Sequence, residues 1–319
     1  MASVSVIIPA FNASRYIRHT LRSVLEQDYR DVEIIVVDDG STDDTEDSVR
    51  EFGSQVRYLR QKNGGQGSAR NAGMAVACGE FFAFVDADDL WLPPKLRLQM
   101  ELFGSNPDLG LVYSDAVIFD QETGKDLWCF SQIARFSSGD VLRPLILRSF
   151  IPTSTVVIRR EIWERVGGFA EDPPPRNTED WDLWLRIASR YRIGFVNAPL
   201  ARYRVHNVSS LRRLDPITHY AHMLSVVEAA VARDPSKIGD LRRKAISAVQ
   251  LSTGKAILQS GARAEARPML LQAFQTDPFG SPAMAYLLLS LLPKRALHSL
   301  VGLKTRLRAA VLRRIVRSV

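Results

Sequence analysis

Three carboxylates directly follow one of the most apolar stretches of this 319-residue chain. In "FFAFVDADDLWLPP" (81–94), five apolar residues precede Asp86, Asp88 and Asp89. Like charges this close repel one another unless a positive group lies between them. Alternating carboxylates in oxygen-only surroundings suit Mg²⁺ or Mn²⁺. The Asp86-Ala87-Asp88 triplet therefore predicts a divalent-metal site, although on its own an aspartate pair is also ordinary turn chemistry.

The elements that must position these carboxylates alternate between strand and helix. Continuous apolar runs predict strands, and helical spacing predicts the helices between them; the strands are 4–8, 32–37, 56–59 and 81–85, and the helices 14–27, 41–52 and 66–78. Apolar strands separated by helices are typical of a parallel sheet that is covered on both faces. Such sheets bind ligands beyond the carboxyl ends of their strands.

Polar clusters follow three of these strands: "PAFN" (9–12), "DDGSTD" (38–43) and "DADD" (86–89). In a parallel sheet all three gather at one edge, which predicts a binding site there. A carboxylate can accept a hydrogen bond from the N–H of a uracil-like base or from ribose hydroxyls, and Phe11 is suited to stack on a base.

The second half of the chain is less regular. Strands are predicted at 109–120 and 153–160, helices at 161–169 and 178–190, and an exposed loop at the proline-rich 171–177. From about Asp215 the pattern is helical throughout.

The net charge of +7 lies at the end of the chain, because 278–319 carries eight Lys and Arg and no Asp or Glu. A solvated helix face explains such a tail, and so does contact with anionic headgroups, which attract it by about 1 kcal/mol per basic residue. Nucleic acid is not expected, since no binding motif accompanies the charge.

The cysteines and the apolar runs bear on the compartment. Cys78 and Cys129 form no metal or redox motif, which is typical of a reducing compartment. The start lacks a signal-peptide pattern, and the apolar run 282–293 is too short to span a bilayer. We expect a cytoplasmic protein, with peripheral contact at the inner face of the plasma membrane left open.

A longer set of motifs resembles a known family. "SVIIPAFNASRYI", "VEIIVVDDGSTDDT" and "NGGQGSARNAGMAVACGEFFAFVDADDLWLP" resemble the nucleotide-sugar half of family 2 inverting glycosyltransferases of the GT-A fold. "YSD", "GGF", "EDWDLWLR" and "YRVHNVSS" are similar to later landmarks of that family, in the same order. The resemblance covers about residues 3–210 and implies a Rossmann-like, mostly parallel sheet with helices on both faces, followed by an α-helical C-terminal region.

The resemblance also implies roles for matching residues. Phe11 and Asp39 match positions that contact the nucleotide base, and Arg70 one near the diphosphate. The implied nucleotide-sugar-binding set is Pro9, Ala10, Phe11, Asp39, Gly40, Arg70, Asp86, Ala87 and Asp88. Asp88 matches the metal ligand, Asp86 a ribose or metal contact, and His206 a residue that approaches the metal or diphosphate; Asp89 is an alternative to Asp88.

Asp180 matches the catalytic base, with Glu179 beside it. A carboxylate must take the proton of an incoming hydroxyl, and a single in-line attack inverts the anomeric carbon. Mn²⁺ or Mg²⁺ would stabilise the departing diphosphate. By themselves, however, two acids in the first turn of a helix are explained by the helix dipole.

We therefore expect a metal-dependent inverting glycosyltransferase. Its donor would be a nucleotide-diphosphate sugar, with UDP as the expected nucleotide, and its acceptor a hydroxyl of a glycan or lipid-linked sugar, as in cell-surface polysaccharide synthesis. The expected domains are catalytic 1–212, with a nucleotide-binding half 1–108 and an acceptor-binding half 109–212, and helical 213–319. Alternatives are a catalytically silent module that binds nucleotide sugars, or a transferase to a protein or small molecule; oligomerisation is left open.

Overall fold

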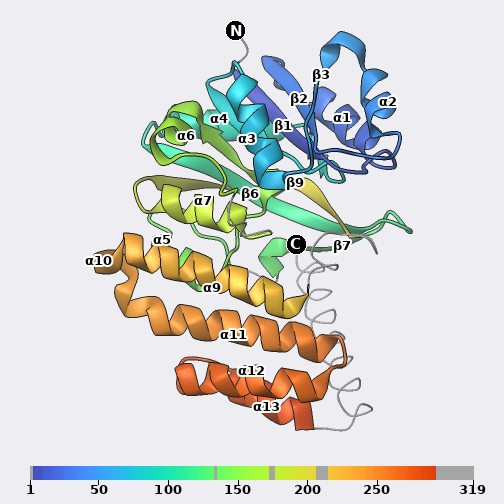
Figure 1. Ribbon diagram of the computed structural model, residues 1–319. Helices are drawn as coiled ribbons and strands as arrows, with labels where there is room; N and C mark the ends of the chain where they lie inside the picture. Colours follow the sequence, from blue (N-terminus) through green and yellow to red (C-terminus); the bar gives the residue numbers. More distant parts are fainter. Residues whose placement is uncertain (1–2, 133–134, 172–176, 206–214, 292–319) are drawn as a thin grey trace, which may run out of the picture. The chain divides into compact units, whose positions relative to one another are not determined.

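The computed structural model describes residues 3–132, 135–171, 177–205 and 215–291 (Figure 1). The chain divides into two compact units, Met1–Arg242 and Arg243–Val319. The first unit is an α/β structure built on one large sheet, and the second is helical. Both features agree with the fold class expected from the sequence.

The sheet of the first unit has nine strands in the order β3-β2-β1-β4-β8-β6-β9-β5, with β7 paired to β6. The strands are β1 Val4–Ala10, β2 Val32–Asp38, β3 Arg57–Arg60, β4 Phe81–Phe84, β5 Leu90–Trp91, β6 Leu109–Asp120, β7 Asp126–Cys129, β8 Val157–Arg159 and β9 Arg192–Val205. The pairs β1–β2, β1–β4 and β2–β3 are parallel, as their continuous apolar sequences predict.

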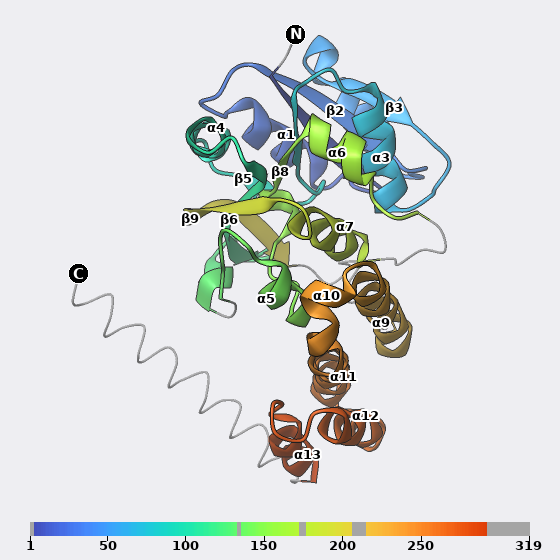
Figure 2. The same cartoon turned by 90° about the vertical axis from the view of Figure 1, so that its left-hand side faces the viewer.

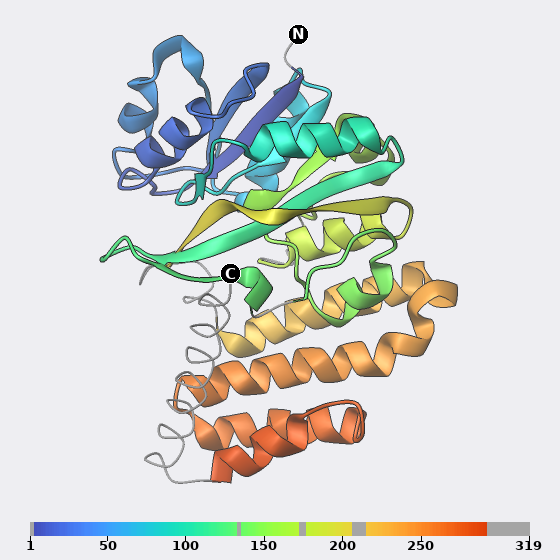
Figure 3. The ribbon, with the colours of Figure 1, turned by 180° about the vertical axis from the view of Figure 1, so that it is seen from behind.

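Beyond β4 the sheet is mixed. Strand β8 is antiparallel to both β4 and β6, whereas the long strands β6 and β9 run parallel side by side (Figure 3). Short β5 pairs antiparallel with β9, through Leu90 opposite Arg202. The chain that follows β4 therefore lies beside the end of β9, although the two are far apart in the sequence.

Helices cover both faces of the sheet; Figure 2 shows α4 on one side and α3 and α6 on the other. On one face, Ile17 and Leu21 of α1 share a buried cluster with Val6 and Ile8 of β1. On the other, a Cβ at Gly73 of α3 would lie 2.7 Å from Ile7 Cγ2, so the absence of a side chain lets α3 approach the sheet closely. The helices of this layer are α1 Ile17–Leu25, α2 Thr45–Arg50, α3 Gln66–Val76, α4 Lys95–Ser105, α5 Leu142–Leu147, α6 Arg160–Val166 and α7 Glu179–Ala188.

The sequence expected one strand over 153–160, but the structure has a 3-10 turn at Thr153–Thr155 before β8 begins at Val157. The hydroxyl and the N–H of Thr155 both donate to the Pro152 carbonyl, at 2.7 and 3.0 Å. Threonine offers the backbone this local alternative to a strand, and the turn lies at the functional edge of the sheet.

The first unit continues past residue 212, where the sequence placed the end of the catalytic domain; that position itself is outside the described residues. It also contains α9 (Pro216–Arg233) and α10 (Pro235–Ile238). Ser189, at the end of α7, donates to Asp234 at 3.1 Å, and Arg143 pairs with Asp240 at 2.6 Å. Arg143 also donates to the Lys237 carbonyl of α10 at 2.7 Å. These polar contacts attach the end of α9, α10 and the turn after it to the α/β layer.

The described part of the second unit contains α11 (Arg242–Gln259), which begins at the boundary, α12 (Arg263–Thr276) and α13 (Ala283–Leu291). Its core is formed by Ile257, Leu258, Ala266 and Leu270, with Tyr286 and Leu287 packed against it. In the described parts of the chain, no helix is both long enough and apolar enough to cross a bilayer.

Candidate active site

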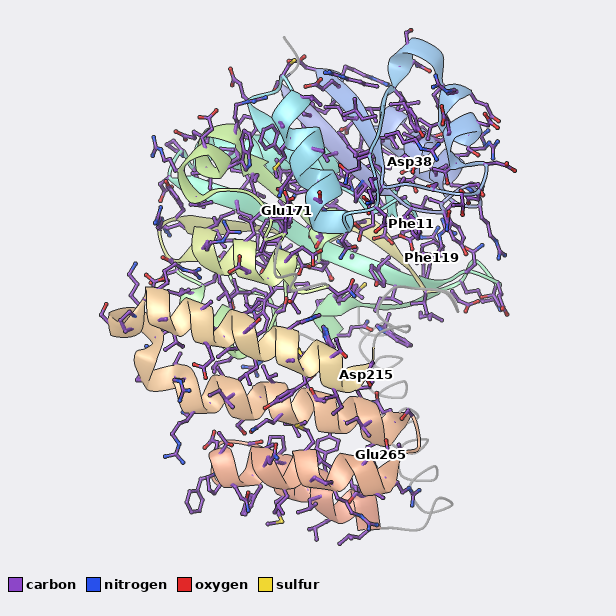
Figure 4. All side chains as sticks on the ribbon, viewed as in Figure 1. Phe11, Asp38, Phe119, Glu171, Asp215 and Glu265 are labelled. Atoms are coloured by element: carbon purple, nitrogen blue, oxygen red, sulfur yellow. The ribbon has the colours of Figure 1, made fainter. Side chains whose placement is uncertain are left out.

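The polar strand ends meet at one edge, as the sequence predicted. Ala10 pairs with Asp38, so β1 and β2 end side by side, as Figure 4 also shows for the labelled Phe11 and Asp38. Pro9 and Ala10 are buried, and the Ala10 carbonyl accepts the Asp39 N–H at 2.8 Å. Phe11 lies just beyond the strand, and half of its surface is exposed. The strand ends thus present an aromatic ring beside a carboxylate.

Asp39 organises the loop that precedes α3. Its Oδ1 accepts from the Gly64 N–H and the Gln61 amide, and its Oδ2 from the Gly65 N–H, each at 2.8 Å. Gly40 next to it has a left-handed φ of 82°, and a Cβ there would lie 3.1 Å from the Asn63 nitrogen. A carboxylate has about four acceptor positions. Among the described contacts, Asp39 Oδ2 accepts one hydrogen bond, which leaves it one further acceptor position.

The three aspartates after β4 have different surroundings. Asp89 is fully buried, its Oδ2 accepts from the Ser154 hydroxyl at 2.5 Å, and its Oδ1 accepts from the Arg204 N–H at 2.9 Å. Asp86 and Asp88 are only partly buried. Asp89 thus ties the turn to neighbouring elements, and Asp86 and Asp88 are the better candidates for a ligand. The sequence could not choose between Asp88 and Asp89.

Burial and mutual repulsion weaken the acidity of Asp86 and Asp89. Burial, together with Asp88 and Asp86, raises the pKa of Asp89 well above its usual range. Burial also raises the pKa of Asp86; Arg70 opposes that rise and Asp88 adds to it. The repulsion that the sequence implied is thus only partly relieved by the protein itself.

Arg70 links the β4 end to the start of α7. It is 1% exposed, and its guanidinium donates to Asp86 Oδ1 at 2.6 Å and to Glu179 Oε1 at 3.1 Å. Glu179 is buried as well, and it also accepts from the Gln66 amide at 2.6 Å. Arg70 of α3 is therefore directly connected to Asp86, which follows β4, and to Glu179, which begins α7; the sequence had named all three.

Asp180, the expected base, follows at the next position of α7 and is partly buried. Its Oδ2 accepts from the Thr153 hydroxyl and its Oδ1 from the Trp181 N–H, both at 2.7 Å. Burial and the neighbouring Glu179 raise the pKa of Asp180 to about 6. A carboxyl with this pKa is ionised at neutral pH and still basic enough to accept a proton.

Several residues of this arrangement were not identified from the sequence. Thr153 donates to Asp180, and Ser154 donates to Asp89 in the turn formed by Asp86–Asp89, called the aspartate turn below. Gln66 donates to Glu179, and Arg204 donates to the Asp88 carbonyl at 2.5 Å. Hydroxyls and amides carry no spacing signal, so only their position in the fold shows what they contact. Ala87 is buried, and its carbonyl accepts from Thr20 at 2.8 Å. His206 lies outside the described residues.

The donor set fits a hard divalent cation bound together with a phosphate-bearing ligand. Within the described residues, no group of three or more His, Cys, Asp or Glu is arranged to hold a metal ion. Mg²⁺ usually takes one or two carboxylates, with water and substrate phosphates completing its shell. Asp86 and Asp88 would supply such a pair, and a cation there would offset the repulsion that raises the pKa of Asp86.

Comparison with known proteins identifies the family. The model described as "Glycosyl transferase family 2" matches residues 5–167. The chain belongs to glycosyl transferase family 2. This confirms the family that the sequence motifs resemble, and the match contains the strand ends and the turn at Thr153–Thr155.

Two relatives of this family 2 member illustrate the range of similarity. Glycosyltransferase RP339 of Rickettsia prowazekii is 34% identical over 207 residues, which span 64% of each chain and so less than two thirds of that relative. WfgD of Escherichia coli is 30% identical over 210 residues, 65% of this chain and 78% of the relative. Its name is UDP-Glc:alpha-D-GlcNAc-diphosphoundecaprenol beta-1,3-glucosyltransferase.

Solved structures show the shared fold. TarS 1–349 of S. aureus, in complex with UDP, aligns with a TM-score of 0.63 at 19% identity and covers 86% of this chain and 81% of its own. The mannosyltransferase PcManGT of Pyrobaculum calidifontis, in complex with GDP-Man and Mn²⁺, aligns with a TM-score of 0.60 at 21% identity and covers 90% and 84%. The chain therefore has the GT-A glycosyltransferase fold.

Proposed function

We propose that this family 2 member transfers a sugar from a nucleoside-diphosphate sugar to a hydroxyl of a glycan or lipid-linked acceptor, with inversion at the anomeric carbon. The observation that carries the proposal is the chain of contacts through Arg70, which connects the carboxylates after β4 to the acids that open α7. A nucleotide-binding strand end and a basic carboxylate are thereby held within one site.

The half of the catalytic domain at 1–108 would bind the nucleotide. The half-exposed ring of Phe11 offers a stacking surface to a base. Asp39 has an acceptor position free for a base N–H, while its other hydrogen bonds keep the loop at 61–65 in place. A uracil N–H matches this acceptor, and two similar proteins, TarS and WfgD, are named with UDP or a UDP-sugar.

Asp86 and Asp88 would hold the divalent ion, Mn²⁺ or Mg²⁺. When bound, the ion supplies positive charge at the diphosphate and so favours its departure. Arg70 keeps Asp86 in place at 2.6 Å, and Ser154 accepts the Asp86 N–H at 3.1 Å. Asp89 fixes the turn from within, through Ser154 and Arg204.

Asp180 would act as the general base. As the acceptor oxygen attacks the anomeric carbon, its proton moves to the Asp180 carboxylate. The bond from the anomeric carbon to the diphosphate oxygen breaks, and the nucleoside diphosphate leaves with the electron pair. The pKa of about 6 leaves Asp180 ionised at neutral pH, and such proton transfer is typically worth about 10²–10⁴-fold. Glu179, held by Arg70 and Gln66, would support the base from the preceding position.

The test is release of nucleoside diphosphate from a panel of nucleotide sugars, with Mn²⁺ or with EDTA, in the presence of undecaprenyl-diphosphate-linked GlcNAc as acceptor. We expect turnover of one donor that requires the metal and falls by about 10²–10⁴-fold in Asp180→Asn, while donor binding persists. Asp182→Asn is the matched control, because Asp182 lies on the same helix and pairs with Arg186 at 2.8 Å. Failure to bind any donor with metal present would refute the proposal.

The alternatives give other results. A catalytically silent module would bind a nucleotide sugar and release no product, and Asp180→Asn would change nothing. A transferase to a protein or small molecule would hydrolyse or transfer the donor slowly and would gain nothing from lipid-linked acceptors. The presence of Asp86, Asp88 and Asp180 in one connected site favours the enzyme.

We propose further that the second unit contacts an anionic membrane surface, which would bring the chain to a lipid-linked acceptor. Met284, Leu288 and Leu291, spaced four and three residues apart, form one stripe along α13 and are 39%, 58% and 60% exposed. The sequence that follows, 292–319, carries eight basic and no acidic residues. An apolar stripe adjoining basic residues is typical of interfacial attachment.

Vesicle sedimentation tests this contact. We expect the full chain to sediment with phosphatidylglycerol-containing vesicles and not with pure phosphatidylcholine, and Leu288→Glu to reduce the bound fraction. Leu127→Glu is the control, since Leu127 is 44% exposed on β7. Equal binding of Leu288→Glu and wild type, or of a chain truncated near Pro293 and wild type, would remove the membrane proposal without touching the catalytic one.

A further inference from the structure

The turn at Thr153–Thr155 lies between two parts of the candidate site that belong to different elements. It directly precedes β8, and Val157 of β8 pairs with Ala83 of β4. The Phe84 N–H donates to the Val156 carbonyl at 3.1 Å, which brings the turn beside the end of β4. Two hydroxyls, on Thr153 and Ser154, extend from neighbouring positions of this turn.

Ser154 closes the aspartate turn. Its Oγ accepts the N–H of Asp86 at 3.1 Å and donates to Asp89 Oδ2 at 2.5 Å. The same four residues are closed by the Asp89 N–H, which donates to the Asp86 carbonyl at 3.0 Å. One hydroxyl thus contacts both ends of the segment that contains Asp88.

Thr153 contacts the other side of the site. Its hydroxyl donates to Asp180 Oδ2 at 2.7 Å, while the Trp181 N–H occupies Oδ1. The charged and titratable groups that act on Asp180 are Glu179 of its own helix, Arg70 of α3 and Tyr203 of β9. The Thr153 hydroxyl stabilises the ionised form and thereby lowers the pKa of Asp180, against the effect of burial and Glu179.

The turn itself is firmly held. The Trp91 indole N–H donates to the Ser154 carbonyl, and the Gln99 amide to the Thr155 carbonyl, both at 2.7 Å. Gln99 in turn accepts from the buried Lys95 at 2.8 Å, and Lys95 Nζ lies 3.9 Å from the centre of the Trp91 ring. Ser154, Thr155, Lys95 and Gln99 are all buried. Side chains anchored in this way keep their positions when a ligand binds.

We infer that Thr153 and Ser154 are positioning residues. They hold Asp86 and Asp88, the proposed metal ligands, at a fixed separation from Asp180, the proposed base. This inference rests on the proposed function, because the separation matters only if Asp180 and the Asp86–Asp89 turn act on one substrate. Ser154 sets the turn that presents Asp86 and Asp88, and Thr153 sets the orientation of the Asp180 carboxylate.

Removing each hydroxyl should give a different defect. Thr153→Val keeps the volume and deletes the donor, so kcat should fall by about 10–100-fold, the loss expected when a reacting group is misplaced. The dissociation constant of the nucleoside diphosphate with Mn²⁺ should stay unchanged. The acid limb of kcat/KM should move to higher pH, because the ionised carboxylate loses a hydrogen bond. Thr153→Ser, which keeps the hydroxyl, should have the kcat and the acid limb of the wild type.

Ser154→Ala should show the opposite pattern. Nucleoside diphosphate binding in Mn²⁺ should weaken by about 10–100-fold, the range seen when the supports of metal ligands are removed. The acid limb of kcat/KM should not move. Thr155→Val is the structural control, because its hydroxyl belongs to the same turn but donates only to the Pro152 carbonyl among the described contacts. It should lower the melting temperature and leave the acid limb in place.

The outcomes separate the inference from the proposed function. If wild type turns over a donor, and Thr153→Val retains its kcat and acid limb, or Thr153→Ser is equally impaired, the role of Thr153 is refuted and the proposed function stands. If Ser154→Ala binds nucleotide and Mn²⁺ as wild type does, the role of Ser154 is refuted. If wild type binds no nucleotide sugar with metal, the proposed function fails, and the inference fails with it.

Discussion

The carboxylates at the ends of β2 and β4 lie at the same edge of one sheet, yet their oxygens have different partners. At the β2 end, Asp38 and Asp39 accept only from neutral groups in the described contacts, and those groups belong to the nearby segment 41–65. At the β4 end, Asp86 pairs with the charged Arg70, 16 positions away, and Asp89 accepts from Ser154 and from the Arg204 N–H, 65 and 115 positions away.

We propose that this difference separates nucleotide recognition, at the β2 end, from the chemical step, at the β4 end. In the described contacts the β2 end is bonded by neutral donors alone, so what Asp39 Oδ2 still offers is an acceptor position for a further neutral donor, such as a base N–H. At the β4 end five carboxylates, Asp86, Asp88, Asp89, Glu179 and Asp180, meet Arg70 and Arg204. Negative charge remains in excess, and it can bind a cation and accept a proton. The predictions below test this division.

The largest effect is expected from Arg70→Met. Arg70 is buried between two carboxylates, so its loss leaves them unpaired and should lower the free energy of unfolding by about 3–5 kcal/mol. Urea unfolding measures the change. Arg97→Met is the control: Arg97 pairs with Asp28 at 2.9 Å on the surface, where such a pair is worth about 0–1 kcal/mol. Equal losses would show that the β4 end is not an integrated charge cluster.

The second prediction separates the two strand ends directly. Asp88→Asn should raise the Mn²⁺ concentration needed for half-maximal activity by at least about 100-fold, since even the supports of metal ligands are worth up to that much. Asp39→Asn should leave the Mn²⁺ requirement unchanged and weaken nucleotide binding, because an amide places a donor against the N–H of Gly64 or Gly65. If both changes raised the Mn²⁺ requirement equally, the proposed division between the β2 and β4 strand ends would be wrong.

Phe11→Ala should produce a smaller effect, confined to the recognition end. Base–aromatic stacking is worth about 1–3 kcal/mol by alanine substitution, so we expect the dissociation constant of the nucleoside diphosphate to rise by about 5- to 150-fold. Calorimetric titration with and without Mn²⁺ measures it. Phe279→Ala, which removes a fully exposed ring from the second unit, serves as the control. Unchanged affinity in Phe11→Ala would exclude stacking at this ring.

The sequence was sufficient for the features that depend on local pattern. Apolar runs located β1, β2, β4 and β6, and the parallel arrangement of the first three placed their polar ends at one edge. The family resemblance then named Arg70 and Glu179, which the structure brings into direct contact. Their roles in catalysis stay predictions.

What the sequence could not supply depends on long-range pairing. Ser154 contacts Asp89 across 65 positions, and Arg204 contacts it across 115. The segment containing Ser154 has the pattern of an ordinary strand, because the threonines and valines around it are β-branched residues, which are enriched in strands. Only the antiparallel pairing of β8 with β4 reveals what those hydroxyls face. The same pairing places Ser154 against Asp89, and so shows that Asp89, not Asp88, is the buried aspartate of the turn.

The smallest effect concerns the pH dependence of kcat/KM. It tests whether the negative charges at the β4 end act on Asp180, the proposed base. Because burial and Glu179 raise the pKa of Asp180 to about 6, the carboxylate is protonated, and cannot act as base, below that pH. We expect kcat/KM to be constant at neutral pH, to reach half that value near pH 6 and to fall about tenfold for each pH unit below it. Glu179→Gln offers a sharper form of the test: the Glu179 charge adds to the rise in the pKa of Asp180, so removing that charge should move the limb to lower pH. A limb near pH 4, typical of an exposed aspartate, would show that the charges at the β4 end do not act on Asp180.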